Sequence, residues 1–190
     1  MGANGIESVD GSLDRAKYLQ IHPLGNVPCL VVDGHAITEA PAILAYIAGL
    51  VPDKHLLGDS PLQQAWAHSW NSWLAWAVQG RGFGALFKPT KFSDDVSTHP
   101  AIQAKAILTV KDCLSTVEGR LAARNFPVGE HETVVDFYLV IFYIWACDAK
   151  FDMAAEYPAY SRLYKRMMEK ESVRGLDLKA KPGLLYVPQE

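Results

Sequence analysis

The chain has 190 residues, of which 49% are hydrophobic, 11% aromatic and 21% charged. This composition supports one domain, or two small ones, with a buried core, and it excludes an intrinsically disordered chain. The formal net charge is only -3, so the chain lacks the basic surface that nucleic acid or an anionic membrane would require.

Simple counts also limit the compartment and the metal chemistry. No apolar run is long enough to cross a bilayer, and residues 1–12 are polar and glycine-rich, unlike a secretory signal. The three cysteines (Cys29, Cys113 and Cys147) are widely spaced and odd in number, which favours a reducing compartment over a disulfide framework. Neither the cysteines nor the six histidines show metal-ligand spacing. We therefore expect a cytoplasmic protein with no metal, nucleic-acid or membrane partner.

The N-terminal part of the chain alternates between strand and helix patterns. Residues 6–9 are a candidate strand, and the apolar positions within residues 13–21 favour a short helix. A turn containing proline and glycine follows. Residues 27–37 then predict an antiparallel hairpin, because a short apolar run precedes the pair Asp33-Gly34, which is typical of a tight turn.

A second helix is expected to start around residue 39. Thr38 would cap this helix, Glu39 suits the positive end of the helix dipole, and Pro41 fits the first turn. The helical spacing continues to residue 50. The segment after it, residues 52–61, contains prolines and charged residues and is interpreted as a linker.

Everything after the linker is interpreted as helical. The predicted helices are residues 62–78, 100–123, 133–146 and 157–170, with a glycine-rich break at 80–84 and a tail over the last twenty residues. The helix at 133–146 is apolar all round, so we expect it to be buried. The domain prediction is an α/β unit over residues 1–51, the linker, and an all-helical domain over residues 62–190.

Two stretches of the first unit resemble the glutathione transferase superfamily. One reads His22-Pro-Leu-Gly-Asn-Val-Pro-Cys-Leu-Val-Val-Asp-Gly34, and the other reads Ile37-Thr-Glu-Ala-Pro-Ala-Ile-Leu-Ala-Tyr-Ile-Ala48. They follow the family's order of a Pro-x-Gly turn, a Val-Pro dipeptide, a hairpin and an acid-containing helix start. In the helical half, Thr133-Val-Val-Asp136 looks like the family's buried capping motif. Gly82-Phe-Gly-Ala-Leu-Phe87 is similar to bacterial beta-class members.

The resemblance implies a fold class of α+β/α. A shortened thioredoxin-like N-terminal domain would precede an all-α glutathione transferase C-terminal domain. It also implies a cis peptide bond between Val27 and Pro28, which leaves backbone groups free to bind the cysteinyl part of glutathione like an added strand. An ordinary trans turn proline is the alternative.

The helix start would bind the other end of glutathione. Glu39 would pair with the ammonium of the γ-glutamyl group, and the amides near Ala40 would attract its carboxylate, with Thr38 in the same binding set. Alternatively, Glu39 only complements the helix dipole. Ala40 stands where the family usually has Ser or Thr, so we expect weaker binding. Lys17 falls where some members place a basic residue for the glycyl carboxylate, although a solvated surface lysine fits the residue as well.

The activating group for the glutathione thiol is not identified. Only a thiolate attacks well, so the family supplies a Tyr, Ser or Cys from a segment that precedes the Val-Pro dipeptide. Because Pro28 lies so early, we expect that the first strand, the first helix and the activating residue are absent. Ser8 and Ser12 are available, but nothing in the sequence distinguishes them.

Two features of the helical half bear on the co-substrate. Beta-class relatives carry His-Lys where this chain has Gly80-Arg81, so Arg81 is a candidate to stabilise a thiolate or an anionic substrate, or else a surface arginine. Four tryptophans, at positions 66, 70, 73 and 76, follow helical spacing and would form one face. That face either packs on neighbouring helices or a dimer partner, or lines a pocket. Asp136 is assigned to helix capping and not to catalysis.

The functional expectation is a glutathione transferase-like homodimer. With glutathione as co-substrate, it would conjugate or isomerise a small hydrophobic electrophile. Two alternatives stay open: a non-catalytic ligand-binding or interaction module of the same fold, and a glutathione-independent isomerase or cyclase acting on an apolar metabolite. A dimer would also cover the sheet edge that a lost strand exposes.

Overall fold

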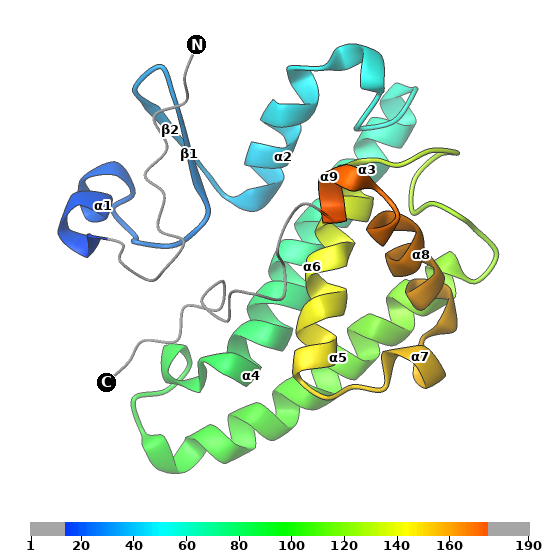
Figure 1. Ribbon diagram of the computed structural model, residues 1–190. Helices are drawn as coiled ribbons and strands as arrows, with labels where there is room; N and C mark the ends of the chain where they lie inside the picture. Colours follow the sequence, from blue (N-terminus) through cyan, green and yellow to red (C-terminus); the bar gives the residue numbers. More distant parts are fainter. Residues whose placement is uncertain (1–13, 175–190) are drawn as a thin grey trace.

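The computed structural model describes residues 14–174, which form a small hairpin unit beside a larger helical half (Figure 1). Helix α1 (Arg15–Ile21) precedes strands β1 (Cys29–Val32) and β2 (His35–Thr38), and α2 (Ala40–Gly49) follows them. Helix α2 contacts both the hairpin and the helical half, so it joins the two parts. The strand predicted at residues 6–9 lies outside the described residues.

The hairpin forms where the sequence predicts it. Strands β1 and β2 pair antiparallel, with Cys29 opposite Thr38 and Val32 opposite His35. Asp33 and Gly34 both have positive φ, at 49° and 80°, as a two-residue hairpin turn requires. These residues therefore set the register that brings the two ends of the hairpin together.

The prediction that Thr38 caps α2 is wrong. Thr38 is the last residue of β2, and the cap position belongs to Glu39, whose side chain makes no capping hydrogen bond. The chain changes from strand to helix within one residue, so Thr38 keeps extended geometry and pairs with Cys29 instead. Pro41 does lie in the first turn, as expected.

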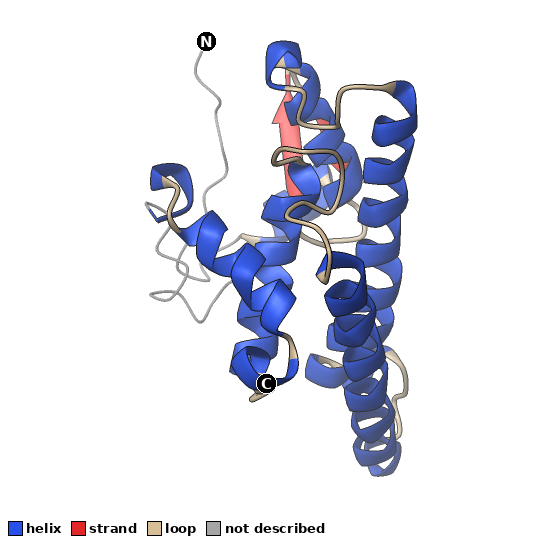
Figure 2. Cartoon of the chain, turned by 90° about the vertical axis from the view of Figure 1, so that its right-hand side faces the viewer, coloured by secondary structure: helices blue, strands red, loops and turns tan. Residues whose placement is uncertain are grey.

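The helical half follows the predicted order with added short elements. Its helices are α3 (Pro61–Trp73), a π-helix (Leu74–Gly84), α4 (Ala85–Phe87), α5 (His99–Leu121), α6 (Val134–Asp148), α7 (Met153–Glu156), α8 (Pro158–Met168) and α9 (Glu171–Arg174). Single 3₁₀ turns lie at Pro52–Lys54, Pro89–Lys91 and Val96–Thr98. Figure 2 shows how little of the described chain is strand. The prediction that the last twenty residues form only a tail is wrong at residues 171–174, which form α9. Within residues 14–174 no helix has both the length and the apolarity to span a membrane.

The expected break at residues 80–84 is also wrong, because this glycine-rich run continues as a π-helix. In a π-helix the close carbonyl is five residues back, and a side chain at Gly84 would place its Cβ 2.8 Å from the backbone oxygen of Gln79. A Cβ at Gly82 would lie 3.0 Å from Val110 Cγ2 of α5. The glycines therefore permit the wide helix and its close approach to α5 rather than ending the helix.

Helix α6 runs through the centre of the helical half and contacts α2, α3, α8 and the π-helix (Figure 1). Leu139, Phe142 and Ala146 of this helix are fully buried, as its apolar sequence predicts. Its first turn holds the predicted capping box. The buried Asp136 carboxylate accepts hydrogen bonds from the Thr133 backbone amide at 2.9 Å and from the Thr133 hydroxyl at 3.2 Å.

The four tryptophans do not share one environment. Trp70 is in the core, and Trp73 is half-buried and packs edge-on against it at a ring separation of 5.8 Å. Trp66 and Trp76 are 47% and 62% exposed. The single face expected from the spacing is not formed: Trp66 and Trp70 already differ in exposure within α3, and the π-helix that begins at Leu74 changes the rotation per residue before Trp76.

Candidate active site

The Val27–Pro28 segment lies at the start of the hairpin, and its peptide bond is cis, as the resemblance implies. The hydroxyl of buried Tyr18 donates to the carbonyl oxygen of Asn26 and so anchors the residue directly before Val27. Val27 itself is exposed, and outside the β1–β2 ladder its backbone makes no hydrogen bond within residues 14–174. Its amide and carbonyl are therefore open to an extended peptide.

The backbone of Glu39 has an unusual conformation at the other end of the hairpin. Its φ of 69° and ψ of 121° fall in a region that costs a residue with a side chain about 1–3 kcal/mol. Its carbonyl oxygen accepts from the amides of Ala42 at 3.0 Å and Ile43 at 3.1 Å, so the first turn of α2 holds the backbone in place. The carboxylate is exposed and has no hydrogen-bond or ion-pair partner among the described residues.

Ala40 begins α2 directly after Glu39. Its side chain is half-buried and packs against the core of the helical half. As the first residue of a ten-residue helix, its amide lies among those that have no partner inside the helix and that attract anions. No hydroxyl is present here to add a second donor.

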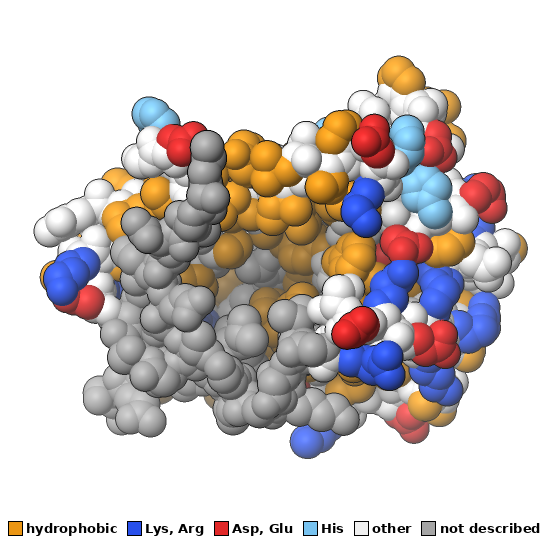
Figure 3. Space-filling model, turned by 45° about the horizontal axis from the view of Figure 1, so that its top comes forward, with side chains coloured by type: hydrophobic (Ala, Val, Ile, Leu, Met, Phe, Trp, Pro, Cys, Tyr) orange, Lys and Arg blue, Asp and Glu red, His pale blue; other side chains and the backbone are white. Residues whose placement is uncertain are grey.

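The register of the hairpin brings these groups together. Cys29 pairs with Thr38, so Val27-Pro28, just before β1, lies beside Glu39 and Ala40, just after β2. One end of the hairpin thus offers a free backbone edge, an unpaired carboxylate and a helix N-terminus. Figure 3 shows hydrophobic side chains gathered around a hollow on the face where the two halves meet.

Two candidates from the sequence make their contacts with other residues. The Lys17 side chain is 78% exposed and pairs with Asp14 at 3.3 Å, which favours the surface-lysine interpretation. Arg81 lies over the exposed ring of Trp76 at 5.1 Å. It also lines a cavity of about 420 Å³ between the π-helix and α5, together with Phe92 and Lys105, and all of the lining residues belong to the helical half.

Two residues that the sequence did not single out do reach the site. Tyr138 of α6 donates its hydroxyl hydrogen to Gln79 Oε1 of the π-helix at 2.7 Å. Burial raises the pKa of Tyr138 well above its ordinary value, and the negative charge of Glu39 raises it further. Helix α6, which carries Tyr138, also contacts α2, which begins directly after Glu39. A polar hydroxyl near the start of an apolar helix was the available signal for Tyr138, whereas nothing local marked Gln79.

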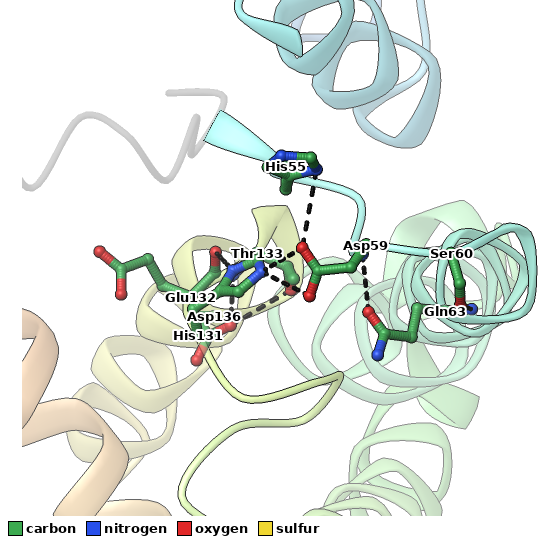
Figure 4. Close-up of polar contacts among 8 residues, drawn as sticks. All are labelled: His55, Asp59, Ser60, Gln63, His131, Glu132, Thr133 and Asp136. Carbon is green, nitrogen blue, oxygen red and sulfur yellow. Dashed lines mark hydrogen bonds and ion pairs between the residues drawn. The ribbon is translucent and has the colours of Figure 1, made fainter. Parts of the chain in front are cut away.

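A second polar group fastens the linker to the helical half (Figure 4). The Asp59 carboxylate contacts His131 Nε2 at 3.1 Å and His55 Nδ1 at 3.6 Å, and the Asp59 amide donates to Gln63 Oε1 at 2.7 Å. The hydrogen bond with Asp59 raises the pKa of His131 above its ordinary value. Across residues 14–174, no three or more His, Cys, Asp or Glu side chains are arranged to hold a metal ion.

Comparison with known proteins gives two family-model matches. The model described as glutathione S-transferase, N-terminal domain, matches residues 6–49, and the C-terminal domain model matches residues 85–171. A curated relative, glutathione S-transferase GST-4.5 of Xanthomonas campestris pv. campestris, is 30% identical over 83% of this chain and 76% of its own length.

A solved structure and a differently named relative complete the comparison. The sphingomonad glutathione S-transferase complexed with glutathione is 32% identical, with a TM-score of 0.73, over 83% of this chain and 75% of that one. Elongation factor 1-gamma of Prunus avium is 31% identical over 63% of this chain, which covers 28% of that protein.

Proposed function

Because the chain belongs to the glutathione S-transferase family, we propose that it binds glutathione at the Glu39 end of its hairpin. In the proposed reaction it transfers the tripeptide to a small hydrophobic electrophile, or uses it to isomerise one. The hydrophobic hollow beside the hairpin supports an apolar co-substrate. The relatives named glutathione S-transferases support the same reaction class.

The observation that carries the proposal is the conformation of Glu39. A strained residue is kept only where the surrounding structure enforces it, and such residues cluster at ligand sites. Here the strained residue carries an exposed carboxylate that makes no capping hydrogen bond to the helix that it begins. The residues fit the tripeptide by chemistry: Glu39 for the ammonium, the Ala40 amide for the adjacent carboxylate, and the Val27 backbone for the cysteinyl amide.

The residue that activates the thiol is not assigned. Ser8 and Ser12 lie outside the described residues, and Arg81 lies on the α5 side of the π-helix. A donor pointed at the sulfur would stabilise the thiolate, which is the reactive form. We therefore assign binding and orientation of glutathione to the described residues, and no proton transfer.

Calorimetry with the full chain and reduced glutathione tests the binding proposal. We expect binding by the unchanged chain and at least tenfold weaker binding by Glu39→Ala, because a charge-assisted hydrogen bond is lost. Glu130→Ala, which removes an exposed acid of the helical half, is the matched control and should bind normally. The absence of any binding heat at millimolar glutathione would reject the proposal.

A non-catalytic binding module of the same fold is the second candidate. It is supported by Ala40, which lacks a hydroxyl, and by the match to proteins named elongation factors rather than transferases. An assay with a generic aryl halide separates the two candidates. Turnover well above the uncatalysed rate establishes the transferase, whereas binding of a hydrophobic dye without turnover establishes the module.

We also propose a homodimer in the cytoplasm. Large apolar side chains are exposed along α3 and the π-helix, at Leu62, Trp66 and Trp76, and along the neighbouring helix α5, at Ile107 and Leu108. Light scattering at micromolar concentration should give twice the chain mass of 21.0 kDa. Trp76→Glu should shift the population toward the monomer, and a monomeric unchanged chain rejects this proposal.

A further inference from the structure

We propose that Tyr138 and Gln79 form the helical-half wall of the site for the amino-acid head of glutathione. In this arrangement the Tyr138 hydroxyl oxygen accepts a hydrogen bond from the ammonium group that Glu39 binds. The inference rests on the proposed glutathione binding and adds to it a second set of recognition residues, from a different part of the chain.

The first support is the hydrogen bond between the two side chains. Tyr138 is 8% exposed, and its ring packs on Phe142 at a separation of 4.9 Å, which holds the phenol in place. The hydroxyl donates its hydrogen to Gln79 Oε1 at 2.7 Å. A phenol has one hydrogen to donate, so the oxygen is left as an acceptor with a fixed direction. An ammonium group is the matching donor.

The second support is the backbone that presents Gln79. It lies in the π-helix, a rare form that occurs frequently at functional sites. The backbone oxygen of Gln79 is the group that the absent side chain of Gly84 leaves room for. The π-helix packs on α6, and α6 also contacts α2, which starts beside Glu39. Local winding thus places Gln79 against the helix that faces the hairpin end.

The third support is the contact between α2, which begins directly after Glu39, and α6, which carries Tyr138. The charge of Glu39 acts on Tyr138, and Ala40, the next residue, packs against the helical core. A carboxylate and a neutral acceptor that act on one ligand group select a cation. The amide nitrogen of Gln79, whose oxygen accepts from the Tyr138 hydroxyl, is a donor and suits a carboxylate. Together these groups match a zwitterionic amino-acid head rather than a simple amine.

A double-mutant cycle on glutathione affinity tests the inference. Calorimetry is run on the full chain, on Tyr138→Phe, on Glu39→Gln and on the double variant. Tyr138→Phe should weaken binding about tenfold, the loss expected when a hydrogen bond to a charged group is removed. The double variant should lose less than the product of the single losses, because both residues act on one ammonium. Cysteinylglycine, which lacks the γ-glutamyl residue, should bind the unchanged chain and Tyr138→Phe equally weakly.

Tyr143→Phe is the matched control. It removes a hydroxyl from the same helix, but that hydroxyl bonds Ser161 of α8 at 2.9 Å and not a residue of the site. Its glutathione affinity should not change. Gln79→Met serves as a second variant if Tyr138→Phe does not fold, and it should weaken binding severalfold, because it frees the hydroxyl to turn away.

The outcomes separate the two claims. An unchanged chain that binds no glutathione rejects the proposed function itself. An unchanged chain that binds, with folded Tyr138→Phe and Gln79→Met variants of equal affinity, rejects only the recognition role of this pair. Independent, multiplicative losses in the cycle would also overturn it, since the two residues would then not share a ligand group.

Discussion

Helices α2 and α6 both begin with a carboxylate, and the two carboxylates have opposite surroundings. Asp136 in the first turn of α6 is fully buried, and it bonds Thr133 on one oxygen and Arg166 on the other, the latter at 3.3 Å. Glu39 at the cap of α2 is exposed and unpaired within the described residues. One acid completes a helix end, while the other leaves its helix end open to a ligand.

The difference shows how one residue type serves two purposes in the same fold. At α6 the acid satisfies the amide and hydroxyl of Thr133, so the buried helix starts without an orphaned donor. At α2 the acid has a strained backbone, and its side chain makes no hydrogen bond to the amides of the helix. A helix start that serves stability uses its side chain internally. A helix start that serves binding, as we propose for α2, leaves its side chain free for the ligand.

Removing the buried acid should give the largest effect. Asp136→Ala leaves the Thr133 amide and Arg166 without a partner, so the free energy of unfolding should fall by about 2–3 kcal/mol. Chemical denaturation measures the loss, with Asp94→Ala, an exposed acid, as the control that should stay within about 0.5 kcal/mol. Equal stability of the two variants would end the contrast between α2 and α6.

The glycines of the π-helix give the next effect. Gly84→Ala places a Cβ 2.8 Å from the Gln79 backbone oxygen and should cost about 1–3 kcal/mol. Gly119 in α5 has nothing within 4 Å, so Gly119→Ala should instead stabilise the chain by about 0.5–1 kcal/mol. Thermal unfolding of the pair shows whether the π-helix, rather than glycine content, sets the difference.

Relieving the backbone strain at Glu39 should stabilise the fold, whereas removing Asp136 destabilises it. Glu39→Gly accepts positive φ without cost and should stabilise the fold by about 1 kcal/mol while it removes the carboxylate. Chemical unfolding and glutathione calorimetry on the same sample should therefore show a more stable protein with a lower affinity for glutathione. A stability loss comparable to that of Asp136→Ala would mean that α2 depends on its acid as α6 does.

The smallest effect concerns the linker contact. The pKa of His131 is raised above 6.5 in the folded chain, mainly by its hydrogen bond with Asp59. The protonated contact therefore stabilises the fold fully below pH 6.5, and the contribution disappears as the pH rises through the raised pKa. Burial raises the pKa of Asp136 to about 6, so ionising this carboxyl costs stability: the cost is absent below pH 3.8, grows as the pH rises from 3.8 to 6, and is complete above pH 6. Melting temperatures of the unchanged chain and His131→Gln should converge at alkaline pH.

Short-range features could be predicted from the sequence. The Asp33-Gly34 hairpin and the Thr133-Asp136 capping box depend on neighbours within a few residues, and both are as predicted. The π-helix was missed because glycine signals a break as readily as a close backbone contact. Tyr138 and Gln79 are 59 residues apart, and that contact depends on how whole helices pack, which no local pattern encodes.

The linker contacts have a consequence for cooperativity. The Val134 amide, in the first turn of α6, donates to the carbonyl oxygen of Leu56 at 2.8 Å, and Asp59 bonds His131 three residues earlier. The linker after α2 therefore cannot separate from the helical half without opening the start of α6. We therefore expect both halves to melt in one calorimetric transition, with equal van't Hoff and calorimetric enthalpies.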